Sequence, residues 1–233
     1  MNSASWGTAS IRKRLQALNL GPVRYYERTG STNEDAARWA ESDAPDLALV
    51  VADEQTAGRG RLGRAWHTPP GAALAFSLIL KDPPDALPPN VTTRMTALGA
   101  LAACEALENR YGLTAEIKWP NDVLLGRRKV AGVLAEALWQ GDTLQAVILG
   151  IGMNVTASAV PEQAALAFPA GFVEAFTGHP VDRLELLEAI LAQVLAWRPQ
   201  LASPAFLEAW QARLAFLSEW VSVLFADLSL IHI

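Results

Sequence analysis

A predicted β-hairpin near the middle of the chain constrains the fold most. The runs KVAGVLAEALW (129–139) and TLQAVILGIGMNV (143–155) are apolar and strand-like, and QGD between them is typical of a turn. Strands joined by a hairpin run antiparallel, whereas a doubly wound parallel sheet joins its strands through crossover helices. Because other predicted strands alternate with helices, we expect an α+β fold: a mixed β-sheet flanked by helices.

The remaining elements follow from hydrophobic periodicity and from start and stop signals. Ser31 is expected to cap a helix, because Glu34 stands three residues later at the capping-box spacing. Helices are predicted at 11–21, 31–42, 92–112 and through most of 181–210, with interruptions at Pro199 and Pro204. Strands are predicted at 23–30, 47–54, 72–80, 114–120, 121–125 and within 219–233, and a proline-rich surface loop at 81–90.

Composition excludes several classes of function. A chain of 233 residues with 51% hydrophobic residues can form one large packed domain. The net charge of −5 argues against a surface that coats nucleic acid. Cys104 is the lone cysteine and lies in an apolar run, so we expect a reduced thiol in a cytoplasmic protein. The start has no secretory signal and the apolar runs are too short to span a bilayer, so no membrane association is expected.

The segment GRGRLGR (58–64) places three arginines and three glycines in seven positions. Guanidinium groups offer forked donors to phosphate or carboxylate, and glycine lets backbone N–H groups approach an anion. It is no dinucleotide-binding fingerprint, because Pro69 and a strand follow it instead of a helix. The alternative is a flexible, solvated surface loop. Gln55 and Trp66 flank the segment with an amide and a flat apolar surface, which favours a small anionic ligand.

A second cluster of polar side chains lies where two predicted strands meet, in KWPND (118–122). Asn121 and Asp122 carry oxygen atoms suited to Mg²⁺, although Pro-Asn-Asp is also typical of a simple turn. Arg127 and Arg128 are expected to be a solvated hairpin tip, whereas Lys129 leads into a strand.

Glycines in the predicted central hairpin have a possible role in ligand binding. Gly132 permits something to approach the strand closely, and the two glycines of LGIGMNV are consistent with a bend or with a ligand that presses on the backbone. The three histidines show no metal-ligand spacing, and no Ser-His-Asp motif is present.

Five segments in this order resemble the biotin protein ligases, over about Val23 to Val155. They are STN (31–33), ADEQTAGRGRLGRAW (52–66), KWPNDVLL (118–125), KVAGVLAE (129–136) and ILGIGMNV (148–155). The resemblance implies a central mixed-sheet domain that is related to the lipoyl ligases. It also implies an enzyme that uses ATP and Mg²⁺ to convert biotin to biotinyl-5′-AMP, with release of pyrophosphate. The biotin then passes to one lysine of a biotin carboxyl carrier protein.

The same resemblance implies roles for individual residues. Lys129, Arg61 and Arg64 would face the junction of carboxylate and phosphate, and Asp122 would assist the transfer step and hold Mg²⁺. The biotin pocket would be formed by Ser31, Thr32, Asn33, Gln55, Gly58, Arg59, Trp66 and Gly132. The nucleotide would be bound by Lys118, Trp119, Asn121 and Asn154.

The resemblance also divides the chain into expected domains: a lead-in at 1–22, the catalytic domain at 23–216 and a stub of an SH3-like barrel at 217–233. No DNA-binding domain fits before Val23, so we expect a ligase that does not bind DNA. An unpaired strand in the stub could support a homodimer. Two alternatives stay open, a lipoate or octanoate ligase on the related fold and a non-catalytic biotin-binding protein. A nucleic-acid-binding protein is the least expected.

Overall fold

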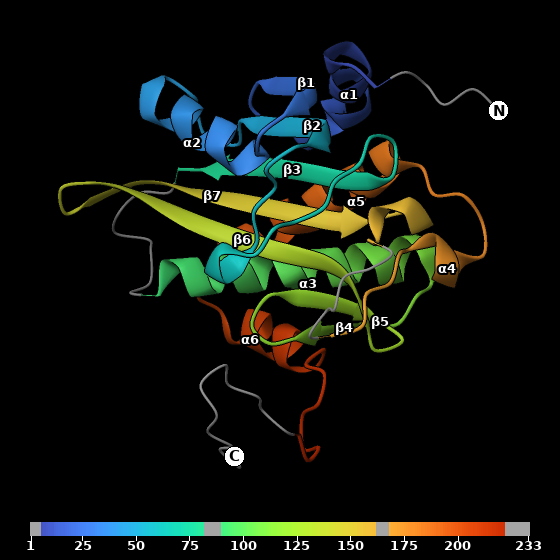
Figure 1. Ribbon diagram of the computed structural model, residues 1–233. Coiled ribbons are helices and arrows are strands. Elements are labelled where there is room, and N and C mark those ends of the chain that lie inside the picture. The colour runs from blue at the N-terminus through green and yellow to red at the C-terminus, as the bar shows by residue number, and fades with distance from the viewer. Residues whose placement is uncertain (1–5, 82–89, 162–167, 222–233) are drawn as a thin grey trace.

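The computed structural model describes residues 6–81, 90–161 and 168–221. A seven-stranded sheet with the order β1-β2-β3-β7-β6-β5-β4 forms its centre (Figure 1). β1 and β2 run parallel, and all the other neighbouring strands pair antiparallel, which confirms the mixed sheet. The strands are β1 (Val23–Thr29), β2 (Leu49–Gln55), β3 (Ala73–Leu80), β4 (Ala115–Lys118), β5 (Asp122–Leu125), β6 (Arg128–Gln140) and β7 (Thr143–Asn154).

The predicted hairpin is the longest strand pair of the sheet. β6 and β7 pair from Ala131 opposite Met153 to Gln140 opposite Thr143, so the turn falls at Gly141, whose φ is +60°. Glycine adopts this left-handed conformation without the steric penalty of a side chain. The pair projects beyond the rest of the sheet at one side (Figure 1).

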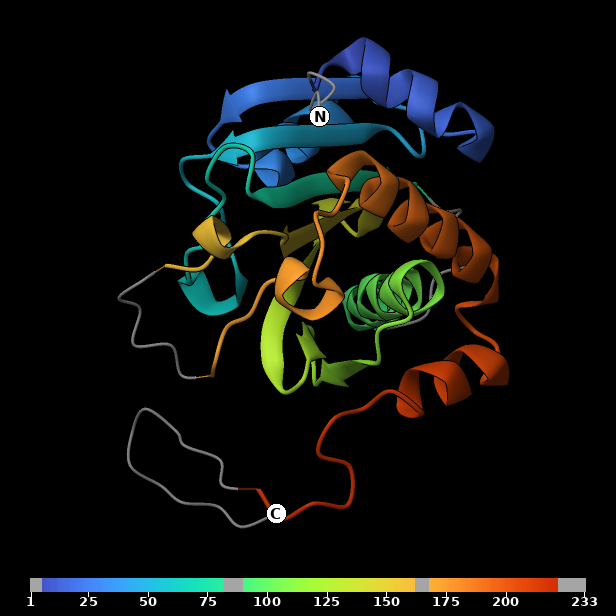
Figure 2. The same cartoon turned by 90° about the vertical axis from the view of Figure 1, so that its right-hand side faces the viewer.

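Most of the helices cover one face of the sheet. They are α1 (Thr8–Leu15), α3 (Val91–Tyr111), α4 (Glu174–Thr177), α5 (Arg183–Trp197) and α6 (Pro204–Gln211), while α2 (Thr32–Ser42) lies apart from them. The larger core cluster joins α1, α3, α5 and α6 to alternate residues of β2, β3 and β7. Figure 2 shows this arrangement, with α3 in green and α5 in orange on the same side of the sheet.

The opposite face of the sheet carries α2 over only part of its area. Ala36, Trp39 and Ala40 of α2 pack against Ile79 of β3 and Ile148 of β7. Since side chains alternate along a strand, residues two and four positions from these lie on the same face. There the strands carry small residues, Ser77 on β3 and Gly150 and Gly152 on β7. A cavity opens on this face next to the first turn of α2, and we call this face the hollow face.

Two details differ from the sequence-based expectations. The first helix ends at Leu15 and a 3-10 turn continues to Leu18, because Asn19 already adopts a left-handed conformation (φ 49°), two residues before Gly21. The Ser31 side chain occupies the N-cap position of α2 but makes no capping hydrogen bond, so the predicted capping box is wrong. The predicted interruptions at Pro199 and Pro204 are confirmed, because α5 ends at Trp197, a 3-10 turn spans Arg198–Gln200 and Pro204 begins α6, consistent with its preformed φ.

Other expectations fall partly outside the described residues. Most of the loop predicted at 81–90 and most of the strands predicted within 219–233 lie there. The expected lead-in at 1–22 contributes Ile11 and Leu15 to the same core as the catalytic segment. In the part of the chain that the structure describes, no helix is both long and apolar enough to cross a bilayer.

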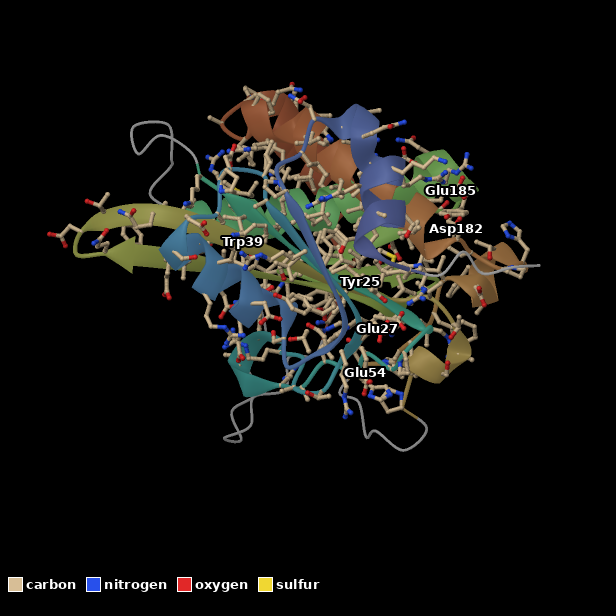
Figure 3. All side chains as sticks on the ribbon, turned by 90° about the horizontal axis from the view of Figure 1, so that it is seen from above. Tyr25, Glu27, Trp39, Glu54, Asp182 and Glu185 are labelled. Carbon is tan, nitrogen blue, oxygen red and sulfur yellow. The ribbon has the colours of Figure 1, made fainter. Side chains whose placement is uncertain are left out.

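Charged groups outside the hollow face mainly hold the elements together. Figure 3 shows Asp182 and Glu185 at the start of α5, beside α1. The Asp182 carboxylate accepts the backbone N–H of Leu184 at 2.8 Å and caps α5. Glu185 pairs with Arg14 of α1 and with Arg110 of α3. These ion pairs connect three helices of the covered face.

Candidate functional site

A cavity of about 920 Å³ opens on the hollow face of the sheet. Its wall is built from the first residues of α2, the segment 55–67 after β2, the β4–β5 turn and the facing side of β6 and β7. All sixteen residues that the sequence analysis assigned to a site lie on this wall: Ser31, Thr32, Asn33, Gln55, Gly58, Arg59, Arg61, Arg64, Trp66, Lys118, Trp119, Asn121, Asp122, Lys129, Gly132 and Asn154. A volume of this size suits a small-molecule ligand, and which residues contact one stays a prediction.

The cavity wall is strongly cationic. Its described residues include five arginine and lysine side chains and a single carboxylate, that of Asp122. The cations are Arg59, Arg61, Arg64, Lys118 and Lys129. In a chain of net charge −5, this concentration of positive charge favours an anionic ligand.

Asp122 and Lys129 form the closest ion pair on the wall. Asp122 lies opposite Gly132 in the β5–β6 ladder, and its Oδ1 is 2.7 Å from Lys129 Nζ. Its Oδ2 is 3.9 Å from Lys118 Nζ. The Lys129 ammonium also lies 5.3 Å from the centroid of the Trp66 ring. The pair therefore holds an ammonium group in a fixed position inside the cavity.

The donor set around Asp122 does not by itself form a metal site. Its carboxylate already contacts two ammonium groups. Within the described ranges no three histidine, cysteine, aspartate or glutamate side chains are placed to hold a metal ion. Asn121 Nδ2 donates to the Val133 carbonyl at 3.1 Å, which directs its amide toward β6. The residues present fit Mg²⁺ only as an ion that other oxygen ligands would largely hold.

The arginine- and glycine-rich segment folds back on itself in a hydrogen-bonded turn, and most of its residues are exposed to solvent. Gly60 N–H donates to the Arg64 carbonyl (2.7 Å), and Trp66 N–H donates to the Gly58 carbonyl (2.8 Å). A 3-10 turn (Arg61–Gly63) closes the segment, and Leu62 at its tip is 89% exposed with φ 58°. This geometry projects the tip of the turn over the cavity mouth.

The three arginines of this segment have different environments. Arg59 contacts two carboxylates, Glu34 at 3.5 Å and Glu136 at 3.0 Å. Arg61 makes only a long hydrogen bond, 3.5 Å to Asn121 Oδ1. Neither Arg61 nor Arg64 has an ion pair among the residues that the structure describes. Arg61 and Arg64 are thus the guanidinium groups available to an anion, whereas Arg59 is already paired.

A buried polar network forms the inner end of the cavity. Gln55 Oε1 accepts from the Thr32 N–H (2.9 Å) and hydroxyl (3.1 Å), and Gln55 Nε2 donates to Thr68 Oγ1 at 3.0 Å. Ser77 Oγ donates to Asn33 Oδ1 at 2.6 Å and lies 2.8 Å from Thr32 Oγ1. The Ser31 hydroxyl, free of any capping bond, lies on the same wall. Such a wall can recognise a neutral ligand group with both donors and acceptors.

The glycines of β6 and β7 make room for protein side chains. A Cβ atom on Gly152 would lie 2.3 Å from Trp66 Nε1, and one on Gly150 would lie 1.9 Å from Asn33 Oδ1. A Cβ atom on Gly132 would lie 3.3 Å from Trp66 Cζ3. The Trp66 indole and the Asn33 amide thus explain why residues 152 and 150 are glycines. Both glycines also line the cavity, so contact with a ligand stays a prediction.

Two further site predictions lie at the edges of the cavity. Trp119 is 66% exposed and lies at its rim. Asn154, which is buried, donates through Nδ2 to the Gly171 carbonyl at 3.0 Å. The segment around Gly171 pairs with Lys129, since Lys129 N–H donates to the Pro169 carbonyl and Gly171 N–H to the Lys129 carbonyl. This segment closes one side of the cavity next to the ammonium group.

Sequence reasoning missed three polar residues that support the site, Ser77, Glu136 and Thr68. Ser77 is the only polar residue in the apolar strand ALAFSLIL and is fully buried. Glu136 stands likewise in the apolar run VLAEALW. An isolated polar residue in a predicted buried strand was the available signal, because a buried polar group requires a hydrogen-bond partner.

A group of polar and charged side chains on β1 and β2 lies outside the cavity. Tyr25, Glu27 and Glu54 lie on the outer strands β1 and β2 (Figure 3). Burial, together with the nearby charges of Asp53 and Glu27, raises the pKa of Tyr25, so its phenol is neutral at pH 7. None of these residues lines the cavity. The fold and the cationic cavity together favour a class of protein that binds a small molecule with an anionic group on one face of a mixed sheet.

Comparison with known proteins identifies the family to which the chain is similar. Residues 25–154 match the biotin/lipoate A/B protein ligase family. The chain is 40% identical over 200 residues to the biotin–[acetyl-CoA-carboxylase] ligase of Paracoccus denitrificans, covering 82% of this chain and 80% of that protein. It is 38% identical over 184 residues to the bifunctional ligase/repressor BirA of Bacillus subtilis, covering 78% of this chain and 56% of that protein.

A solved structure shows the same fold. The biotin protein ligase of Aquifex aeolicus in complex with biotin and ATP superposes with a TM-score of 0.73 at 30% identity, covering 90% of this chain and 84% of that chain. The chain therefore belongs to the biotin/lipoate A/B protein ligase family. It spans little more than half the length of the Bacillus subtilis relative.

Proposed function

We propose that this chain is an ATP-dependent biotin protein ligase. It converts biotin and ATP to biotinyl-5′-AMP and pyrophosphate, and then transfers biotin to a lysine of a biotin carboxyl carrier protein. The observation that carries the proposal is one cavity with a neutral polar wall at one end and clustered cations beside it. Relatives of the chain are biotin ligases by name, and one similar structure holds biotin and ATP.

The two ends of the cavity suit the two parts of the first reaction. Gln55, Asn33 and Ser31 would hydrogen-bond the ureido group of biotin, with Trp66 as an apolar wall. The biotin carboxylate, with a pKa of about 4 to 5, is ionised at neutral pH and needs no general base. Catalysis then consists of bringing a carboxylate and a triphosphate together against their repulsion.

The cations would supply this electrostatic stabilisation. Lys129, held at 2.7 Å by Asp122, would contact the carboxylate and the α-phosphate as the bond between them forms. Arg61 and Arg64 would cover the phosphate from the turn above the cavity mouth. Lys118, Trp119, Asn121 and Asn154 would bind the nucleotide. A closed turn of this kind also excludes water from the mixed anhydride.

Mg²⁺ would enter bound to the triphosphate, because Asp122 is the single carboxylate on the described wall. The ion would reduce repulsion between the phosphates and the carboxylate. In the transfer step the carrier lysine, with an ordinary pKa near 10.4, must lose a proton. Asp122, the single carboxylate on the described wall, would accept it.

The proposal also covers the setting of the reaction. The use of ATP and of a carrier protein favours a reaction in the cytoplasm, and the proposal includes no role for DNA. The expected homodimer was inferred from 217–233, most of which lies outside the described residues, and it stays a prediction. The expected domain limits at 22 and 216 likewise stay predictions.

Pyrophosphate release with Mg-ATP tests the proposal. The purified chain is assayed with biotin, with lipoate and with neither. The proposal predicts release that depends on biotin and not on lipoate. Release with lipoate alone would identify a lipoate ligase, and biotin binding without release would identify a non-catalytic binding protein.

A further inference from the structure

A continuous chain of hydrogen bonds joins the arginine- and glycine-rich turn to the floor of the cavity. Arg59 Nη2 donates to both oxygens of Glu136, at 3.1 and 3.0 Å. Glu136 Oε2 also accepts from Asn33 Nδ2 at 2.7 Å, and Asn33 Oδ1 accepts from Ser77 Oγ at 2.6 Å. One carboxylate thus connects a residue of the turn with a buried residue of the pocket.

The position of Glu136 follows from the alternation of β6. Gly132, Leu134 and Glu136 share one face of the strand, and the first two line the cavity. Glu136 lies one step further along and does not line it. Its two partners, Arg59 and Asn33, both line the cavity and connect it to a bound ligand.

The environment of Arg59 shows why this contact is specific. Its guanidinium lies between Glu136 of β6 and Glu34 of α2, whereas Arg61 and Arg64 have no carboxylate partner within the described ranges. The turn therefore has one arginine fixed to the sheet and two directed to the cavity. The Asn33 amide also packs directly against the sheet, because it occupies the space that a Cβ atom on Gly150 would fill.

We propose that Glu136 is a positioning residue of the ligand site. Its carboxylate fixes the turn through Arg59 and sets the orientation of the Asn33 amide, so that the two halves of the pocket wall keep one relative position. The effect on biotin affinity rests on the proposed function, whereas the effect on the turn does not.

Hydrogen exchange of the unliganded chain tests the structural part. Glu136→Gln keeps an acceptor for Asn33 but removes the charge that holds Arg59. Amides within 56–66 should then exchange about two- to fivefold faster, as expected for a partly exposed ion pair, while peptides of β3 stay unchanged. The matched control is Glu41→Gln, which neutralises an exposed glutamate near the end of α2.

A double-mutant cycle separates positioning through Arg59 from general destabilisation. It compares Glu136→Gln with Arg59→Gln and with the double variant Arg59→Gln/Glu136→Gln. If Glu136 acts through Arg59, the double variant exchanges no faster than Arg59→Gln alone, which also loses the pair with Glu34. In a biotin-dependent assay, Glu136→Gln should raise KM for biotin about two- to fivefold and change kcat less. The proposal would be overturned if Glu136→Gln exchanged no faster than the Glu41→Gln control. It would also be overturned if the increases in exchange rate of the two single variants added in the double variant. A wild-type chain without ligase activity would refute the proposed function and leave the exchange result to decide this one.

Discussion

Gly152→Ala tests whether the Trp66 indole determines the shape of the cavity. The new methyl group would lie 2.3 Å from Trp66 Nε1 and 2.6 Å from Cε2, so the ring must move. Overpacking of this kind lowers the free energy of unfolding by about 1 to 3 kcal/mol. Replacing glycine by alanine raises it by about 0.4 to 1 kcal/mol, because alanine restricts the unfolded chain. The free energy of unfolding should therefore fall by about 1 to 2 kcal/mol.

Gly132→Ala is the matched control, since its methyl group faces the same ring at 3.3 Å and the flexible Lys129 side chain at 3.4 Å. Its unfolding free energy should stay within about 0.5 kcal/mol of wild type. Urea unfolding of the three proteins measures both values. Displacement of the indole in Gly152→Ala should also weaken biotin binding at least about tenfold, a loss of about 1.4 kcal/mol. Equal stability of the two variants would refute the role assigned to Trp66.

Three other changes test separate parts of the site and core. Lys129→Ala should lower biotin-dependent pyrophosphate release at least about a hundredfold and leave the circular dichroism spectrum unchanged. The control is Lys13→Ala, which removes an exposed lysine. Release by Lys129→Ala close to that of the control would show that Lys129 takes no part in the chemistry. Ser77→Ala leaves Asn33 Oδ1 without its donor, so urea unfolding should show a loss of about 1 to 2 kcal/mol, and wild-type stability would contradict the network. Burial, reinforced by the charge of Glu108, raises the pKa of the Cys104 thiol in the folded state. In the unfolded chain this thiol loses its proton around pH 8.5, whereas in the folded state it stays protonated at that pH. The stability of wild type relative to Cys104→Ala should then fall as pH rises above that value, by up to about 1.4 kcal/mol per pH unit, and a constant difference between pH 7 and 10 would refute it.

The sequence predicted the mixed sheet because its evidence was local. The β6–β7 hairpin is visible as two apolar runs and a turn, and α3 as one long run that ends at Gly112. Helix ends were less certain, because Asn19 can adopt the left-handed conformation that was expected of Gly21. The Ser31 side chain was assigned to a cap, yet no capping bond forms and its hydroxyl lies on the cavity wall.

The supporting polar network was beyond prediction because its partners are distant along the chain. Ser77 and Asn33 are 44 residues apart, and Asn33 and Glu136 are 103 apart. The motif segments identified residues that face the cavity, but only the register of β3, β6 and β7 shows which neighbours hold them. The same register shows that glycines at 150 and 152 accommodate Asn33 and Trp66.

The most direct test of the account is the product that the purified chain forms from biotin and Mg-ATP. After incubation, the protein is separated from free nucleotide and its bound small molecules are identified by mass spectrometry. The account predicts biotinyl-5′-AMP retained by the wild-type chain and absent from Lys129→Ala. Recovery of biotin and ATP alone from the wild-type chain would contradict the claim that this cavity joins them.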